Sequence, residues 1–292
     1  MTVAAAIFFG LVQAATEFLP VSSTAHLLIL GELVGYDLGD ARFRAFATII
    51  QMGTTLAVIA YFREDLARLV RAGLVSLAHA RPLETPESRL AWYIVLGTIP
   101  AAVAGKLLER RIEALGNWVI AGSLVGLGLV LLVAEVYARH RRALGDVRAS
   151  DALLIGVGQA VALVPGSSRS GTTLTTGMLL GFTREAAARF SFLLSVPIIL
   201  GAGAYKVYKD APALRGSGWT AATLVATAVA AVAGYAVIHW LLGWLRTRTT
   251  YLFVLWRLAA GVVLAVLIWR GVLPSHEALE HGPPAPPPSL SR

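Results

Sequence analysis

Long stretches without a charged residue recur along the chain and indicate its architecture. Residues 249–269 contain one charged residue, Arg257, and there are none in residues 1–16, 45–62, 90–105, 119–134, 190–205 and 218–238. A membrane-spanning helix needs about 17–25 mostly apolar residues. Inside lipid only helices and closed barrels satisfy the backbone, and these stretches are too long for barrel strands. The pattern therefore predicts an all-α polytopic membrane protein with a single integral membrane domain, residues 1–275.

Two of the apolar stretches are interrupted by a proline followed by polar residues. The first reads Gln13-Ala-Ala-Thr-Glu-Phe-Leu-Pro-Val-Ser-Ser-Thr-Ala-His26. The second reads Gln159-Ala-Val-Ala-Leu-Val-Pro-Gly-Ser-Ser-Arg-Ser-Gly-Thr-Thr173. Broken apolar segments at matching places in two halves of a chain point to a binding site in the membrane. We therefore expect an internal repeat with halves of approximately residues 1–145 and 146–275.

The first broken segment concentrates side chains that suit nucleophilic and acid–base chemistry. It places Glu17 one helical turn after Gln13, and it continues with Ser22, Ser23, Thr24 and His26. A carboxylate at membrane depth is costly and by default belongs to a functional site. The set supplies a nucleophile, a proton carrier and an orienting carboxylate. Structural roles remain open: an interfacial helix end for Glu17, N-caps for the hydroxyls and a hydrogen-bonded interior imidazole for His26.

The second broken segment carries Arg169, and no other charged residue lies between Asp151 and Arg184. A planar guanidinium suits bidentate binding of phosphate. The hydroxyl donors around it are Ser167, Ser168, Ser170, Thr172 and Thr173. Phosphate binding is the favoured interpretation, and the alternative is a structural arginine paired with a carboxylate such as Glu17.

Composition narrows the range of partners. Charged residues make up 14% of the chain and hydrophobic residues 57%, whereas soluble domains carry about 25% charged residues. The net charge of +8 comes from short basic clusters between apolar stretches, such as residues 63–71 and 139–142. That pattern is typical of anchors at a lipid surface, so we expect a bilayer and no nucleic acid as partner. The proline-rich residues 276–292 predict a disordered tail without chemistry.

Both broken segments resemble the signatures of the undecaprenyl-diphosphatase family, which is associated with bacitracin resistance. The family's first motif is Glu or Gln, three residues, Glu and then Phe-Leu-Pro-Val-Ser-Ser-Thr-x-His, which corresponds to Gln13 through His26. Its second motif, Pro-Gly-x-Ser-Arg-Ser-Gly-x-Thr, is complete from Pro165 to Thr173. The chain departs from the family at Gln13, where many relatives have Glu, and at Ala25, where Gly is usual.

The resemblance implies six spanning helices plus two re-entrant helical hairpins in an inverted repeat. It implies that Glu17, Ser23, His26 and Arg169 are catalytic and that Ser168 and Thr173 line the same site. The residue patterns above add further ligands of the diphosphate: Gln13, Ser22, Thr24 and Ser170. The family also implies a divalent cation, Mg²⁺ or Ca²⁺, which would bridge Glu17 and the diphosphate. Since Gln13 replaces a carboxylate, we expect weaker cation binding here.

The implied activity is hydrolysis of undecaprenyl diphosphate to undecaprenyl phosphate and inorganic phosphate, which recycles the lipid carrier for cell-wall peptidoglycan synthesis. We expect a multi-pass protein of the bacterial inner membrane, with its active site facing the outer side, and a homodimer is a further expectation. Ser23 or a water attacks the terminal phosphorus, His26 shuttles the proton, and Glu17 orients His26 or binds the cation.

A transporter is the alternative, because broken helices in inverted repeats are also typical of transporters. A polyprenyl-phosphate flippase or an anion transporter that uses Arg169 would show the same hydropathy. The set of Ser, His and Glu favours the enzyme, since transport of a phosphate does not need it. A structural membrane scaffold would leave both motifs unexplained.

The distribution of basic residues predicts the orientation. If both broken segments fold back and the other apolar stretches span, both termini lie on one side. Lys and Arg are more numerous in the loops of the opposite side, so the positive-inside rule places both termini outside. We expect a reporter that is active only outside the cytoplasm to be active when fused after Arg292. Activity of a cytoplasm-specific reporter at the same position would contradict this orientation.

Overall fold

The computed structural model describes residues 1–36, 40–113, 115–214 and 218–275, so the predicted disordered tail lies outside the described residues. The described part is helical apart from turns and one isolated β-bridge between Arg142 and Phe182. In chain order the elements are α1 (Val3–Phe18), α2 (Ser23–Leu33), α3 (Ala41–Tyr61), α4 (Arg63–Ala78), α5 (Pro86–Glu113), α6 (Asn117–Tyr137), η1 (Leu144–Asp146), α7 (Ala149–Val161), α8 (Arg169–Leu179), α9 (Arg184–Ile198), η2 (Ile199–Gly203), α10 (Ala204–Asp210), η3 (Ala211–Leu214), α11 (Thr220–Thr247) and α12 (Tyr251–Trp269).

Within the described residues, six helices are long and apolar enough to cross a membrane. They cover Ala41–Tyr61, Pro86–Leu108, Asn117–Tyr137, Arg184–Leu214, Thr220–Thr247 and Tyr251–Trp269. Side-chain caps begin two of them, because Asp40 accepts from the second residue of α3 and Thr183 accepts from the third residue of α9. Their number and apolar character confirm the predicted all-α, multi-pass fold.

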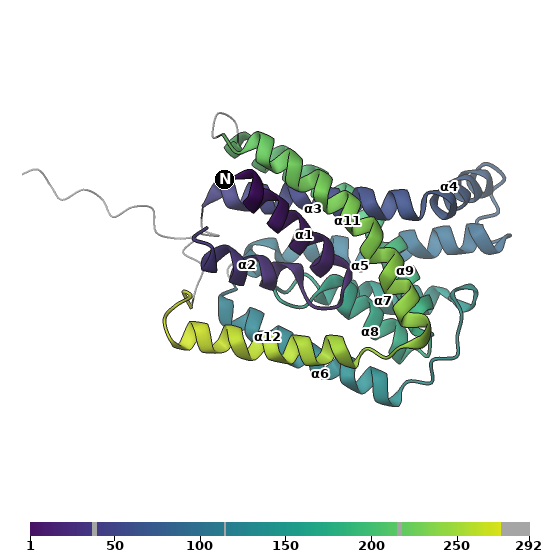
Figure 1. Cartoon of the computed structure of the whole chain (residues 1–292). Helices are drawn as coiled ribbons and strands as arrows, with labels where there is room; N and C mark the ends of the chain where they lie inside the picture. The colour runs from purple at the N-terminus through teal and green to yellow at the C-terminus, as the bar shows by residue number, and fades with distance from the viewer. Residues whose placement is uncertain (37–39, 114, 215–217, 276–292) are drawn as a thin grey trace, which may run out of the picture.

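The two broken segments form helical hairpins from helices too short to span by themselves. Hairpin α1–α2 has helices of 16 and 11 residues, and hairpin α7–α8 has helices of 13 and 11 residues. At 1.5 Å per residue these helices are about 16–24 Å long. The hairpins start from opposite ends of the molecule, and their bends meet in its interior (Figure 1). Entry and exit through the same membrane face stays a prediction.

The halves of the chain contain the same order of elements. Hairpin α1–α2 precedes the spans α3, α5 and α6, and hairpin α7–α8 precedes the spans α9, α11 and α12. Each hairpin packs against a helix of the opposite half of the chain: α1 packs along α11, and α7 packs along α5. The start of α1 and the end of α12 lie at the same end of the molecule (Figure 1). Each hairpin is therefore held by a span of the other half.

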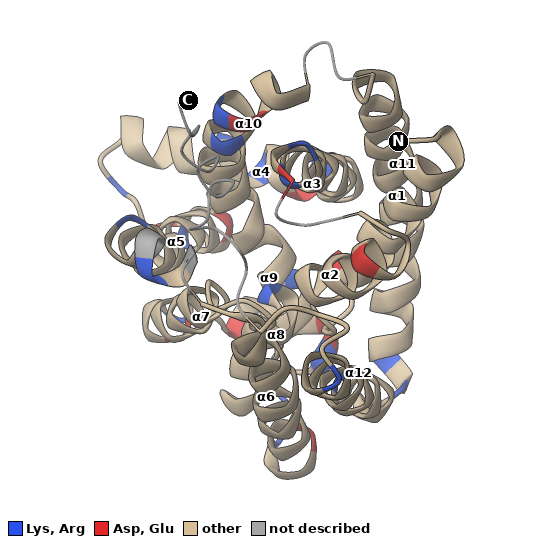
Figure 2. Cartoon of the chain, turned by 90° about the vertical axis from the view of Figure 1, so that its left-hand side faces the viewer, with Lys and Arg blue, Asp and Glu red and all other residues tan. Residues whose placement is uncertain are grey.

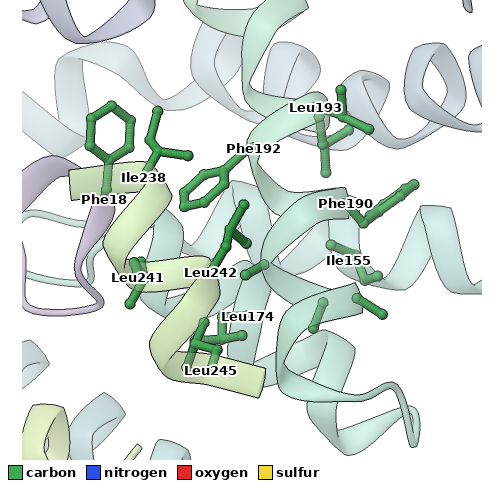
Figure 3. Close-up of a cluster of buried hydrophobic side chains, with 14 of the residues drawn as sticks. Phe18, Ile155, Leu174, Phe190, Phe192, Leu193, Ile238, Leu241, Leu242 and Leu245 are labelled. Carbon is green, nitrogen blue, oxygen red and sulfur yellow. The ribbon is translucent and has the colours of Figure 1, made fainter. Parts of the chain in front are cut away.

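The main hydrophobic core surrounds the inner ends of the hairpins. Figure 3 shows Phe18, at the end of α1, beside Phe192 of α9 and Ile238 of α11. The rings of Phe18 and Phe192 meet edge to face, with centroids 5.6 Å apart. Lipid is as apolar as these side chains, so close packing rather than water exclusion stabilises such contacts in a membrane. The core thus holds Phe18, the residue that follows Glu17, in place.

Backbone contact between helices α5 and α7 depends on glycine. A Cβ atom added at Gly156 would lie 2.3 Å from the carbonyl oxygen of Gly97, and one added at Gly97 would lie 2.8 Å from that of Ala152. Small residues at such crossings let helices approach closely in lipid. This contact seats hairpin α7–α8 against the first half of the chain.

We expect Gly156→Ala to destabilise the protein by about 1–3 kcal/mol, because the methyl group forces α5 and α7 apart. Gly122→Ala is the matched control, since a Cβ at Gly122 of helix α6 meets no atom within 4 Å. The apparent melting temperature in detergent measures both. A fall for Gly122→Ala as large as that for Gly156→Ala would contradict the assignment of this crossing.

Candidate active site

The two hairpin bends are built in the same way. Ser22 caps α2 and Ser168 caps α8, each accepting from the backbone N–H three residues later. Both serines have positive φ, 74° and 68°, in a region that residues other than glycine rarely occupy. Such strain costs about 1–3 kcal/mol, persists only when surrounding contacts enforce it, and clusters at functional sites. The N-capping role predicted as an alternative is therefore correct for Ser22, and Ser168 has the same role in the second bend.

Glu17 is the acceptor at which the bends converge. Its Oε1 accepts from Arg169 Nη2 at 2.5 Å and from Gln51 Nε2 at 3.4 Å. Its Oε2 accepts from Ser23 Oγ at 2.8 Å and from Gln13 Nε2 at 3.0 Å. Four donors from α1, α2, α3 and α8 thus surround one carboxylate whose side chain is 5% exposed. The structure brings together four residues singled out from the sequence, Gln13, Glu17, Ser23 and Arg169, and adds Gln51.

Arg169 has the carboxylate partner that the structural alternative predicted, and it also has one nitrogen without a partner in the described structure. It forms an ion pair with Glu17 across 152 residues of sequence. Its other terminal nitrogen, Nη1, is buried and has no hydrogen-bond partner in the described structure. Figure 2, viewed from one end of the bundle, shows that most of the ribbon carries neither acidic nor basic residues. The guanidinium is therefore neutralised on one side and has free donor capacity on the other.

The neighbouring hydroxyl groups of hairpin α7–α8 mainly hold the backbone. Ser170 Oγ donates to the carbonyl of Leu19 at 3.1 Å and so ties the two hairpins together. Thr173 Oγ1 donates to the carbonyl of Arg169 at 2.6 Å and lies 2.5 Å from Ser191 Oγ. Thr24, by contrast, is exposed and makes no hydrogen bond to the other predicted ligands in the described structure. Diphosphate binding by these residues stays a prediction.

Both ring nitrogens of His26 are engaged, but neither is bonded to Ser23 or Glu17. His26 Nδ1 lies 2.7 Å from the carbonyl oxygen of Ser22, and Nε2 lies 2.7 Å from Nε1 of Trp256. His26 is 8% exposed and its imidazole is hydrogen-bonded, as the alternative structural interpretation predicts. The Ser23 hydroxyl donates to Glu17 instead. His26 therefore contacts the backbone of the bend at Ser22 and not the Ser23 hydroxyl.

Arg257 of helix α12 donates hydrogen bonds to backbone carbonyls of both hairpin bends. Its side chain is 1% exposed, and all of its hydrogen-bond partners in the described structure are backbone carbonyls. Their distances run from 3.1 to 3.4 Å, and they belong to Pro20, Ser123, Leu124, Gly166 and Ser167. One guanidinium thus connects hairpin α1–α2, hairpin α7–α8 and helix α6.

The sequence interpretation missed the roles of Trp256 and Arg257. A signal existed for Arg257, which is the only charged residue in the apolar residues 249–269. No pattern marked Trp256, because tryptophan is common at membrane surfaces. Gln51, within the charge-free residues 45–62, bonds from α3 to Glu17 of α1 and so belongs to the same cluster.

The residues present fit a divalent cation only together with substrate oxygens. No group of three or more His, Cys, Asp or Glu side chains gathers among the described residues. The amide oxygen Oε1 of Gln13 is buried without a hydrogen-bond partner, beside Glu17. Mg²⁺ is commonly held by one or two carboxylates together with substrate phosphates. One carboxylate and one free amide oxygen agree with that manner of binding.

The fold and the site define a class: a multi-pass membrane protein in which two helical hairpins bring a carboxylate, a serine and an arginine together in the interior. Residues 6–263 match the family of the bacitracin resistance protein BacA, and the chain belongs to that family. It is 74% identical over 284 residues to an undecaprenyl-diphosphatase of Anaeromyxobacter sp. (strain Fw109-5), covering 97% of this chain and 93% of the relative. An undecaprenyl-diphosphatase of Myxococcus xanthus is 47% identical, with 99% and 98% covered.

We expect Arg257→Lys to lower stability by about 2–4 kcal/mol, because a lysine ammonium leaves several buried carbonyls without a donor. Thermal unfolding in detergent measures the effect. Arg270→Lys is the control, since Arg270 lies at the exposed end of the same helix. Equal melting temperatures for Arg257→Lys and the unaltered protein would show that the hydrogen bonds of Arg257 to these carbonyls contribute little.

Proposed function

We propose that this protein hydrolyses undecaprenyl diphosphate to undecaprenyl phosphate and inorganic phosphate. Membership of the BacA family and the names of its relatives support this substrate. The observation that carries the proposal is the unpartnered Nη1 of Arg169, beside a serine hydroxyl that donates to a carboxylate. A guanidinium with free donors suits a diphosphate. The pairing of hydroxyl and carboxylate suits phosphoryl transfer, and no observation favours the flippase or anion transporter.

The Ser23–Glu17 hydrogen bond supports a covalent route. Ser23 Oγ attacks the terminal phosphorus while its proton passes to Glu17, 2.8 Å away. The bond from that phosphorus to the bridging oxygen breaks, and undecaprenyl phosphate leaves. Water then attacks the phosphoserine, which releases inorganic phosphate and restores the Ser23 hydroxyl. Arg169 stabilises the charge on the transferring phosphoryl group throughout.

The geometry favours Glu17 rather than His26 as the acceptor of the Ser23 proton. His26 has no ring nitrogen free in the described structure, since Ser22 and Trp256 engage both. A proton shuttle by His26 stays a prediction that needs one of these bonds to break. Direct attack by water remains the competing route, because phosphoryl transfer depends mainly on positioning and charge stabilisation.

A divalent cation belongs to the proposal as an aid to substrate binding. Glu17, the free Oε1 of Gln13 and the diphosphate oxygens would hold it. Bound there, it would neutralise phosphate charge. The described residues by themselves bind and orient the diphosphate through Arg169 and supply the proton acceptor through Glu17.

We also propose that the site faces the outer side of the bacterial inner membrane, with the prenyl chain between helices and open to lipid. The distribution of Lys and Arg in the loops supports the orientation. The apolar spans support membrane insertion. A homodimer stays a prediction.

We expect Arg169→Lys to lower kcat/KM by at least about 100-fold, because lysine keeps the charge but not the fork that binds Glu17 and phosphate together. Phosphate release from undecaprenyl diphosphate by purified protein in detergent measures this. Arg246→Lys, in an exposed ion pair with Glu185, is the control. Near-normal turnover of Arg169→Lys would mean that the residue is only a general positive charge.

Acid quenching of turnover separates the two nucleophiles. With substrate labelled in its terminal phosphate, we expect label on Ser23 in the unaltered protein and none in Ser23→Ala, which should be severely impaired. Peptide mapping locates the label. Absence of label during rapid turnover, including in a slowed His26→Ala variant, would favour direct attack by water, with Ser23 as a donor to phosphate.

We expect Gln13→Glu to lower the concentration of Mg²⁺ or Ca²⁺ that gives half-maximal activity, because a second carboxylate strengthens cation binding. Titration of cation into chelator-treated protein measures this. A half-maximal concentration that is equal or higher in Gln13→Glu would argue against a cation beside residue 13.

A further inference from the structure

The hydrogen bonds of His26 determine which of its nitrogens carries the proton. An indole N–H can only donate, so Trp256 Nε1 requires His26 Nε2 to accept at 2.7 Å. A carbonyl oxygen can only accept, so Ser22 requires His26 Nδ1 to donate at 2.7 Å. Together these partners select a neutral imidazole with its proton on Nδ1. The planes of the His26 and Trp256 rings are nearly parallel, with an angle of 9° between them.

The same bonds form a chain that ends at the proposed nucleophile. Trp256 donates to His26, and His26 donates to the carbonyl of Ser22, the strained residue with φ of 74°. Ser23 follows directly and donates to Glu17. The direction of the Ser23 hydroxyl therefore depends on a bend that His26 holds, and the direction of the imidazole depends on Trp256.

We propose that Trp256 is a positioning residue of the active site, which acts through the neutral Nδ1–H form of His26 on the Ser22 bend and thereby aims Ser23 at Glu17. The proposal rests on the proposed phosphatase function for its kinetic consequence. Trp256 itself does not touch the reacting atoms: it lies on helix α12 with 54% of its surface exposed. An outward-facing tryptophan is thus joined to the interior site through a single N–H group.

Trp256→Phe removes the N–H group and keeps an aromatic ring on the outer face of α12. Losing one hydrogen bond in the chain should lower kcat about five- to tenfold, with KM nearly unchanged because the Arg169 site for the diphosphate is intact. Trp269→Phe is the matched control, on the same helix and 74% exposed. Replacing Trp256 by β-(3-benzothienyl)alanine keeps the shape of the indole but has sulfur in place of N–H, and it should reproduce the loss.

Nitrogen NMR of protein with ¹⁵N-labelled histidine rings tests the tautomer directly. The signal of His26 is identified by its absence in His26→Gln. We expect a protonated Nδ1 and an accepting Nε2 in the full-length protein in detergent, a changed pattern in Trp256→Phe, and no change in Trp269→Phe. In a His26→Gln background, Trp256→Phe should cause no further loss of kcat, because its effect passes through His26.

Three results would overturn the proposal: an unchanged His26 signal in Trp256→Phe, normal kcat in the benzothienyl variant, or an equal further loss of kcat in the His26→Gln background. Failure of the proposed function is a separate result. It would show as no phosphate release from undecaprenyl diphosphate by the unaltered protein, while the NMR measurement would still establish or reject the hydrogen-bonded tautomer.

Discussion

The ion pair between Glu17 and Arg169 is the constraint on which the remaining structure depends. Both side chains lie inside a bundle of apolar spans, and a buried charge that loses its partner costs about 3–5 kcal/mol. The pair forms only when the bends of both hairpins reach the same depth. Packing of α1 along α11 and of α7 along α5 therefore has to be accurate before either charge is stable.

One side chain, that of Arg257, stabilises the strained backbone of both bends. Ser22 and Ser168 have unfavourable positive φ angles, and the carbonyls of Pro20, two residues before Ser22, and of Ser167 accept from the same side chain, Arg257. Among the described residues, Arg257 forms no ion pair with an acidic side chain, and its partners are backbone carbonyls. A fork of N–H donors in fixed geometry can reach several carbonyls at once, which an ammonium group cannot.

Two hairpins of similar construction contribute different chemistry. Hairpin α1–α2 supplies the carboxylate and the serine that donates to it, whereas hairpin α7–α8 supplies the guanidinium with one nitrogen unpartnered. Two bends of the same construction thus produce an asymmetric site, and the proposed mechanism assigns attack on phosphorus to one hairpin and phosphate binding to the other. Ser170 joins the halves through the carbonyl of Leu19.

The sequence by itself determined the spans, the two breaks and most of the side chains around Glu17. Charge-free length and helical spacing are local properties, so the stretch 45–62 and the pair Gln13 and Glu17 could be predicted without a fold. Only the tertiary structure decided that Ser23 bonds to Glu17 rather than to His26, although His26 is nearer in sequence. It also placed Trp256 against His26, 230 residues away. Such contacts depend on the packing of α12 against the hairpins, which no local spacing contains.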